Sequence, residues 1–281
     1  MEVKEQFKSY YHFHKDKGED FQHGGQRVKG IFKQSTDLRP LISVITAVYN
    51  GGQYLEESID SIKTQNYQNF EHIIIDGCST DKTPDIIKRN EDNIDYWISE
   101  KDKGIYDAFN KGLKLAKGDY IVFVNSDDKL YDNNVFSTVI KYFKNNKDLD
   151  FLFGPVKKHW GLLHGYKPWK IRFSWGFYSS HSTGFFIKKN AAKKIGFYNL
   201  AYKYSSDYDY FYRMIVKLKM RGTSTKKDEI FGIFRRGGFS SKINFIDHFF
   251  ETIKIRLDNG QNKFLVLLIF ILKYLKNNQK F

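Results

Sequence analysis

The chain has 281 residues, of which 41% are hydrophobic and 17% aromatic, which is enough to fill one large or two small cores and excludes a disordered chain. A single cysteine, Cys78, excludes an internal disulfide framework and a cysteine-rich zinc site. The net charge of +14 is unevenly spread, with −4 on residues 1–150, +14 on residues 151–240 and +4 on residues 241–281. This asymmetry indicates an anionic partner, such as nucleic acid, an anionic membrane surface or a phosphorylated substrate.

Residues 1–39 are polar and show no sustained hydrophobic period, which predicts an N-terminal extension that either packs on a domain or stays mobile. The first twenty residues lack the apolar segment of a signal peptide, so we expect a cytoplasmic location.

Residues 40–130 alternate strand patterns with helix patterns. The run LISVITAV after Pro40 is continuously apolar and rich in β-branched residues, which predicts a strand buried on both faces. Further strands are predicted at residues 72–76, 96–98 and 120–125, with helices between them at residues 53–65, 84–90 and 105–118. This spacing predicts right-handed βαβ units in a parallel sheet, and therefore an α/β fold.

Three groups of polar residues follow predicted strands of this sheet. They are Asn50-Gly51-Gly52, Asp76-Gly77 and Asp127-Asp128. Because ligands of such sheets bind outside the carboxyl ends of the strands, we expect the three groups to be neighbours in space. None of them forms a P-loop or a GxGxxG motif, which removes the main support for an ATPase or a dinucleotide-dependent oxidoreductase.

The pair Asp127-Asp128 is the sharpest chemical signal. Adjacent carboxylates repel one another unless a cation lies beside them, and Mg²⁺ or Mn²⁺ held by one or two carboxylates and phosphate oxygens is the expected occupant. The alternative is a solvated turn that caps a helix, since DDKLYDNN is also good turn sequence. Asp76, expected at the same edge, favours the metal site.

Beyond residue 150 the pattern is less regular. A strand is predicted at residues 185–187 and a helix at residues 207–218. Two more helical patterns follow at residues 243–257 and 264–275, and lysines flank the second, which is very apolar. Its longest apolar run has nine residues, far fewer than the roughly twenty of a spanning helix, so we expect either an interfacial membrane contact or packing on the domain or a second copy.

The segments ISVITAVYNGGQYLEESIDSIKTQNYQNFEHIIIDGCSTDKT and EKDKGIYDAFNKGLKLAKGDYIVFVNSDD resemble family 2 glycosyltransferases, especially bacterial enzymes that build surface polysaccharides. The resemblance is dense over residues 41–130 and thinner over residues 181–214. It implies the GT-A fold, in which helices flank a Rossmann-like, mostly parallel central sheet. We expect this domain at residues 40–240, with a nucleotide-sugar half at 40–130 and an acceptor half at 131–240, followed by a C-terminal helical tail at 241–281.

The resemblance also implies a nucleotide-sugar donor, most commonly a UDP-sugar in this family, and a divalent metal, Mn²⁺ or Mg²⁺. Position by position, Asp128 matches the metal ligand. The residues implied to bind or support the donor are Ala47, Val48, Tyr49, Asn50, Glu56, Asp76, Asp102, Lys103, Asn110, Asp127 and His181.

Some of these matches have alternatives. The common family form is Asp-Asp-Gly-Ser where this chain has Asp76-Gly77-Cys78-Ser79, so the resemblance implies no second carboxylate there. Asp102 and Lys103 also suit an ordinary helix start with surface charges. His181 suits a contact to donor phosphate, metal or acceptor, or a hydrogen-bonded structural residue.

Sugar transfer with inversion requires a base that takes the proton of the acceptor hydroxyl. Residues 151–240 contain only four acidic residues: Asp207, Asp209, Asp228 and Glu229. Asp207 lies in a segment that resembles the acidic acceptor-side motif of the family, and we expect it to be the base. The alternative is an N-cap of the helix that follows.

The function expected from these residues is a metal-dependent, inverting glycosyltransferase. Its acceptor is expected to be a saccharide hydroxyl, and a polyprenyl-pyrophosphate-linked saccharide would explain both the basic half and the apolar tail. Peripheral attachment to the inner face of the plasma membrane would then accompany the cytoplasmic location. Two alternatives remain, a non-catalytic nucleotide-sugar-binding protein and a basic nucleic-acid-binding protein, although a nucleic-acid partner would not require Asp76 and Asp127-Asp128 at one edge of the sheet.

Overall fold

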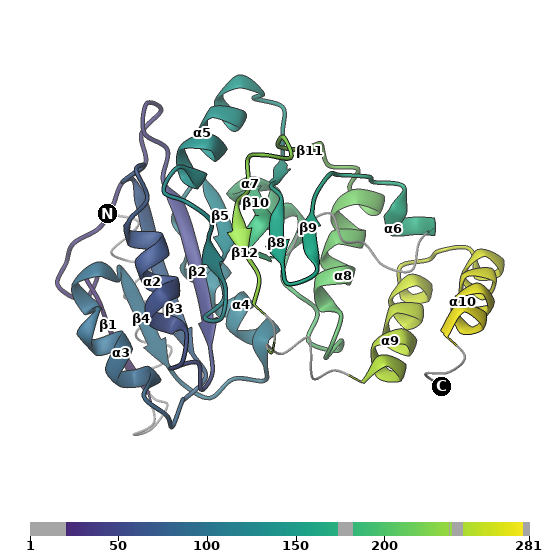
Figure 1. Ribbon diagram of the computed structural model, residues 1–281, viewed down its shortest axis with the longest axis horizontal. Helices are drawn as coiled ribbons and strands as arrows, with labels where there is room; N and C mark the ends of the chain where they lie inside the picture. Colours follow the sequence, from purple (N-terminus) through teal and green to yellow (C-terminus); the bar gives the residue numbers. More distant parts are fainter. Residues whose placement is uncertain (1–20, 174–181, 236, 238–243, 278–281) are drawn as a thin grey trace.

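The computed structural model describes residues 21–173, 182–235, 237 and 244–277. An eight-stranded sheet runs through its centre in the order β1-β4-β3-β2-β5-β10-β7-β11 (Figure 1). The bounds of its strands are β1 Gln22–Gly24, β2 Ile42–Val48, β3 Phe70–Asp76, β4 Tyr96–Ser99, β5 Tyr120–Phe123, β7 Phe151–Phe153, β10 Phe185–Lys188 and β11 Gly222–Ser224. Six strands point one way, and β1 and β10 are antiparallel to their neighbours, which confirms a mostly parallel sheet.

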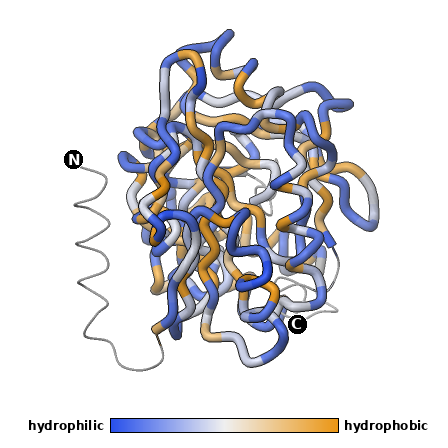
Figure 2. Tube along the Cα trace, turned by 90° about the vertical axis from the view of Figure 1, so that its left-hand side faces the viewer, coloured by the Kyte–Doolittle hydropathy of each residue, from blue (hydrophilic) through white to orange (hydrophobic). Residues whose placement is uncertain are grey.

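Helices cover both faces of this sheet because residues of the buried strands alternate between the two sides. Ile45 and Ala47 of β2 pack with α4 (Ile105–Leu115), in a cluster that also contains residues of α7 (Lys189–Ile195) and α8 (Ser206–Tyr212). Val44 and Val48 face the opposite side, which is covered by α2 (Leu55–Lys63), α3 (Thr83–Arg89) and α5 (Val135–Asn145). Hydrophobic segments therefore run through the middle of the molecule and hydrophilic segments lie outside (Figure 2).

A second, four-stranded sheet was not expected from the sequence. Its order is β6-β12-β8-β9, and its bounds are β6 Lys129–Leu130, β8 Val156–Lys158, β9 Gly161–Leu163 and β12 Gly232–Ile233. The strands have two or three residues each, too few for an alternating pattern to stand out. Because β6 begins directly after Asp128, this sheet forms beside the carboxylate pair.

The remaining elements lie mostly in the C-terminal half. They are α6 (Lys170–Phe173), α9 (Phe245–Asp258), α10 (Lys263–Asn277) and the short helices Glu91–Asn93, Ser182–Gly184 and Arg213–Lys217. The predicted helix at 207–218 is an α-helix only as far as Tyr212 and continues as a π-helix. The helical tail is confirmed as α9 and α10. Within the described residues, no helix meets the length and hydropathy needed to cross a bilayer.

Part of the predicted N-terminal extension belongs to the central sheet. β1 pairs antiparallel with β4, opposite residues Trp97–Ser99. Behind it, Arg27 is buried and reaches the interior, where it forms an ion pair with the equally buried Glu71 of β3. The division of the chain into extension, two halves and tail stays a prediction.

Candidate active site

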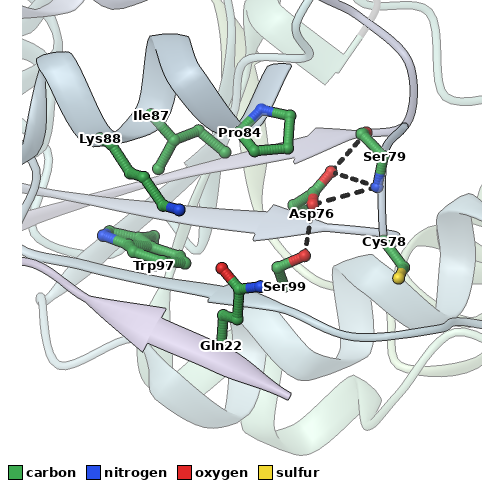
Figure 3. Close-up of a pocket in the computed structure, with 9 residues that line it drawn as sticks. All are labelled: Gln22, Asp76, Cys78, Ser79, Pro84, Ile87, Lys88, Trp97 and Ser99. Carbon is green, nitrogen blue, oxygen red and sulfur yellow. Dashed lines mark hydrogen bonds between the residues drawn. The ribbon is translucent and has the colours of Figure 1, made fainter. Parts of the chain in front are cut away.

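Asp76 ends β3 and lies at the carboxyl edge of the sheet, opposite Val48 of β2 on one side and Ser99 of β4 on the other. Its carboxylate is fully buried and accepts hydrogen bonds from the hydroxyl groups of Ser79 and Ser99, both at 2.5 Å, and from the backbone N–H of Ser79 (Figure 3). Hydrogen bonds from two separate segments hold this carboxylate in one orientation.

A cavity of about 180 Å³ opens beside Asp76 (Figure 3). Apolar walls come from Pro84 and Ile87 of α3 and from Trp97 of β4, and Lys88 supplies a cation. The remaining lining residues are Gln22, Asp76, Cys78, Ser79 and Ser99. The cavity thus combines flat apolar walls with one buried carboxylate, which suits a heterocyclic ring that carries hydrogen-bond donors.

The loop after β2 joins this cavity to the carboxylate pair after β5. Asn50 adopts a left-handed conformation with φ 49°, and its backbone N–H donates to Ser79 Oγ at 2.8 Å. On the next residue, Gly51, a Cβ atom would lie 2.7 Å from Ser126 Oγ, so only glycine allows the loop to approach so closely. The loop therefore lies against both groups of acidic residues, and Asp76 and Asp128 occupy the same edge of the sheet.

Asp128 sits in a tight turn after β5, in which its backbone N–H donates to the carbonyl oxygen of Asn125 at 3.0 Å. The side chain is 1% exposed and accepts a hydrogen bond of 2.8 Å from Thr183 Oγ1. Burial lowers the pKa of Lys158 in the second sheet. The negative charge of the nearby Asp128 acts against this and raises the pKa of Lys158. The adjacent Asp127 is half-buried in the same turn.

Asp102 and Lys103 precede α4, in a loop that lies beside the segment after Asp76. The carboxylate of Asp102 lies beside Gly77, where a Cβ atom would be 2.8 Å from Oδ2, and it accepts a hydrogen bond from the N–H of Gly104. Burial raises the pKa of Asp102, and the negative charges of Asp107 and Asp76 act in the same direction. Lys103 is exposed, and its backbone N–H donates to Asp107.

Two residues after Gly104, the side chain of Tyr106 reaches the first turn of α8. Its hydroxyl group donates to Asp207 Oδ1 at 3.1 Å and lies 3.2 Å from the carbonyl oxygen of Tyr204. Burial raises the pKa of Tyr106 well above its usual value, and the negative charge of Asp207 raises it further. The phenol therefore stays protonated and remains a hydrogen-bond donor. Asp207 itself is exposed in the first turn of α8. Tyr106 thus connects the loop of Asp102 to Asp207.

The other predicted site residues occupy varied places. Ala47 and Val48 are buried in β2, whereas Tyr49 is 66% exposed beside Gly77. Glu56 lies on the surface of α2 and pairs with Arg89 at the end of α3.

Asn110 is buried in α4, and both ends of its amide group bond to the backbone of Tyr198, so its contacts are with the protein. Asp209 is buried in α8, where it pairs with Arg213 and accepts a hydrogen bond from Asn259. His181 lies outside the described residues.

The donor set at Asp127 and Asp128 fits a hard divalent cation, because both side chains offer carboxylate oxygens. The described part of the chain contains no group of three or more His, Cys, Asp or Glu side chains that could hold a metal. Cations such as Mg²⁺ are typically held by one or two carboxylates together with phosphate oxygens of a substrate.

Sequence reasoning missed Tyr106, Thr183, Ser79 and Ser99 as partners of the carboxylates. Ser79 lies three residues after its partner Asp76, whereas the other three residues contact a carboxylate from a distant segment of the chain. The one signal available was their position next to predicted site residues, such as Thr183 two residues after His181.

Comparisons with known proteins match this chain to glycosyltransferases. The family model of glycosyl transferase family 2 matches residues 43–211. An uncharacterised glycosyltransferase of Rickettsia typhi is 32% identical over 197 residues, which are 65% of this chain and 61% of that protein. A Bacillus subtilis glycosyltransferase, TuaG, named for teichuronic acid biosynthesis, is 41% identical over 97 residues, 34% of this chain and 38% of that protein. The chain thus matches less than two thirds of the length of these curated relatives.

Two solved structures share the fold. The crystal structure of residues 1–349 of Staphylococcus aureus TarS in complex with UDP-GlcNAc has a TM-score of 0.61 and 18% identity, and the match covers 84% of this chain and 73% of that one. The mannosyltransferase PcManGT of Pyrobaculum calidifontis in complex with GDP-Man and Mn²⁺ has a TM-score of 0.62 and 18% identity, over 89% of this chain and 74% of that one. The fold is GT-A, as the sequence predicted.

Proposed function

The chain belongs to glycosyl transferase family 2, and we propose that it transfers a sugar, with inversion, from a nucleotide-diphosphate donor to a hydroxyl group of a saccharide acceptor in surface polysaccharide synthesis. The observation that carries this proposal is that the segments of Asp76, Asp102 and Asp128 lie together at one edge of the sheet. The Asn50 loop lies against the segments of Asp76 and Asp128, and Tyr106 connects the neighbouring Asp102 loop to Asp207.

The cavity beside Asp76 is proposed to receive the base of the nucleotide. A carboxylate that is already held by Ser79 and Ser99 can accept a hydrogen bond from a ring N–H without reorienting. The exposed ring of Tyr49 beside Gly77 offers a face for stacking. A uracil base is the first candidate, since a solved neighbour binds UDP-GlcNAc, and the GDP-Man of the other makes guanine the second.

The diphosphate is proposed to lie between this cavity and Asp128, with Lys103 and Lys158 as the nearby cations. A divalent cation at Asp128 would neutralise the negative charge that grows on the leaving diphosphate. Asp127 supports the turn that presents Asp128. We expect Mn²⁺ or Mg²⁺ to bind together with the nucleotide, because such cations are commonly held by one or two carboxylates and the phosphate oxygens of a substrate.

Asp207 is proposed as the base. Its exposed carboxylate removes the proton of the acceptor hydroxyl, whose oxygen attacks the anomeric carbon while the bond to the diphosphate oxygen breaks and its electron pair leaves with the nucleotide. Attack from the face opposite the leaving group inverts the configuration. The hydroxyl group of Tyr106 donates to Asp207 Oδ1, which orients the carboxylate and leaves Oδ2 available for the acceptor.

The test of this function separates donor binding from transfer. Nucleotide sugars are screened with Mn²⁺ for thermal stabilisation, and the one that stabilises the protein most is used as donor. We expect Asp207→Asn to lower the rate of nucleotide release about 10²–10⁴-fold and to leave the stabilisation by donor unchanged. Equal rates for the native protein and Asp207→Asn would reject Asp207 as the base, and no stabilisation by any nucleotide sugar would reject the function.

The lipid part of the acceptor is proposed to meet the outer face of α10. Six large apolar side chains line one face of this helix, each at least 43% exposed: Phe264, Leu267, Leu268, Ile271, Leu272 and Leu275. Residues 259–281 contain four lysines and no Asp or Glu, which suits an anionic membrane surface. Two antiparallel copies of the helix would instead bring Lys263 and Lys276 of opposite chains together.

Sedimentation with anionic phosphatidylglycerol vesicles tests this contact. The double variant Leu267→Gln and Leu268→Gln is expected to reduce the bound fraction more than fivefold, because both side chains would enter the interface. Leu38→Gln, at another exposed leucine outside α10, is the control and should bind like the native protein. Undiminished binding by the double variant would contradict the proposal.

A further inference from the structure

Glu251 of α9 directs its carboxylate to the segment that precedes α8. Its two oxygens accept hydrogen bonds from the backbone N–H groups of Lys203 at 2.6 Å and Tyr204 at 2.7 Å. These two residues precede α8 and therefore Asp207. A charged acceptor on two consecutive N–H groups fixes the orientation of the peptide units between them.

The carbonyl group of Tyr204 extends this contact to the reaction centre. Its oxygen lies 3.2 Å from the hydroxyl group of Tyr106, which is also 3.1 Å from Asp207 Oδ1. Two acceptors, one from the backbone and one from the proposed base, therefore share one phenol. Stacking against Tyr198, with ring centroids 5.7 Å apart, holds the ring of Tyr106 in place.

α9 lies close to Asp207 as well as to Tyr204. In Figure 1, α8 and α9 run side by side, and Asn259, the residue that caps the C-terminus of α9, donates to Asp209 of α8 at 2.8 Å. His248 lies one turn before Glu251, and burial lowers its pKa. The negative charge of Asp207 is near enough to act against this lowering. The tail helix is thus packed against the first turn of α8, where the base is found.

We propose that Glu251 is a positioning residue for the sugar-transfer reaction: through the backbone of Tyr204 and the hydroxyl group of Tyr106, it sets the orientation of the Asp207 carboxylate. The proposal rests on the proposed function, in which Asp207 is the base. It assigns a role in the reaction to α9, which lies beyond the residues 43–211 matched by the family model.

A double-mutant cycle on nucleotide release tests this coupling. The probe is UDP-GlcNAc with Mn²⁺, or the donor identified by the stabilisation screen, with water as acceptor. We expect Glu251→Ala and Tyr106→Phe each to lower kcat roughly tenfold with KM within twofold of the native value. Because both changes break the same chain of contacts, the double variant should lose little more than either single variant.

Asp258 provides the matched control. It lies on the same helix and accepts a hydrogen bond of 2.7 Å from Tyr202, two residues before Tyr204, without reaching Tyr106. Asp258→Asn should keep kcat within twofold. An equal loss in this variant, or a roughly hundredfold loss in the double variant, would overturn the proposal.

Glu251→Gln guards against misfolding of the alanine variant. Its amide keeps one acceptor oxygen, so kcat should lie between those of the native protein and Glu251→Ala, and a kcat equal to the native value would also overturn the proposal. If the native protein releases no nucleotide from any donor, the proposed function fails instead, so the two failures are distinguishable.

Discussion

At the scale of single residues, the carboxylates of the site differ in burial and in the hydrogen bonds that they accept. Asp76 is buried and accepts hydrogen bonds from Ser79 and Ser99, which leaves it one orientation. Asp207 is exposed and receives one side-chain hydrogen bond, from Tyr106. Asp209, only two residues away, is buried with Arg213 and contributes to packing instead. Similar side chains therefore differ in their exposure and in the partners that hold them.

Gly77 allows a prediction at this scale. A methyl group on its Cα would lie 2.8 Å from Asp102 Oδ2 and 3.3 Å from the ring of Tyr49. Gly77→Ala should therefore displace both side chains and weaken binding of the donor nucleotide roughly three- to tenfold, as measured by calorimetry with UDP and Mn²⁺. The melting temperature distinguishes this local effect from unfolding, and native affinity in a folded variant would refute the proposed base site.

At the scale of elements, strands with a continuous apolar run were predicted well and short strands were not. β2 and β3 are buried along their whole length, so their residues could be identified without knowledge of their neighbours. The second sheet is made of strands of two or three residues whose pairing depends on segments that are far apart in the chain, such as Leu130 and Gly232. No local pattern could reveal that pairing.

The packing of α10 on α9 contains a buried lysine that yields a prediction about stability. Lys273 is 6% exposed and lies over the ring of Phe249 at 4.8 Å. Burial, assisted by the charge of Arg256, lowers the pKa of Lys273 to about 8. Between about pH 8 and 10.5, the ordinary pKa of a lysine, the unfolded chain binds more protons than the folded one, so the free energy of unfolding rises with pH across this window.

Lys273→Met should remove that pH dependence and raise the free energy of unfolding at pH 7 by about 1–2 kcal/mol, after the loss of the contact with Phe249 is deducted. Urea denaturation at pH 7 and pH 10 measures both quantities. A variant that is less stable than the native protein at pH 7 would show that the lysine contributes more than its burial costs.

At the scale of the whole molecule, the chain before β2 is tied to the centre of the sheet. Arg27 and Glu71 are 4% and 2% exposed, and Arg27 also donates to the carbonyl oxygen of Leu115. Arg27→Met would leave Glu71 buried without its cation, and we expect the free energy of unfolding to fall by about 3–5 kcal/mol.

Chemical denaturation tests this loss. Lys29→Met is the control, because Lys29 and its partner Asp92 are exposed and such pairs contribute little. A loss that is equal in the two variants would mean that the Arg27 pair adds nothing beyond the surface contact.

The sequence by itself determined the class of fold, the parallel order of strand and helix along residues 40–130 and the edge at which the acidic loops gather. It could do so because burial on both faces, helical periodicity and strand-end carboxylates are local properties of the chain. Only the tertiary structure decided which side chains contact these carboxylates. The hydroxyl group of Tyr106 meets Asp207 across about a hundred residues of sequence, and Thr183 meets Asp128 across more than fifty, because sheet pairing and helix packing bring those segments together. Such contacts depend on how whole layers pack, and no local pattern in the chain encodes them.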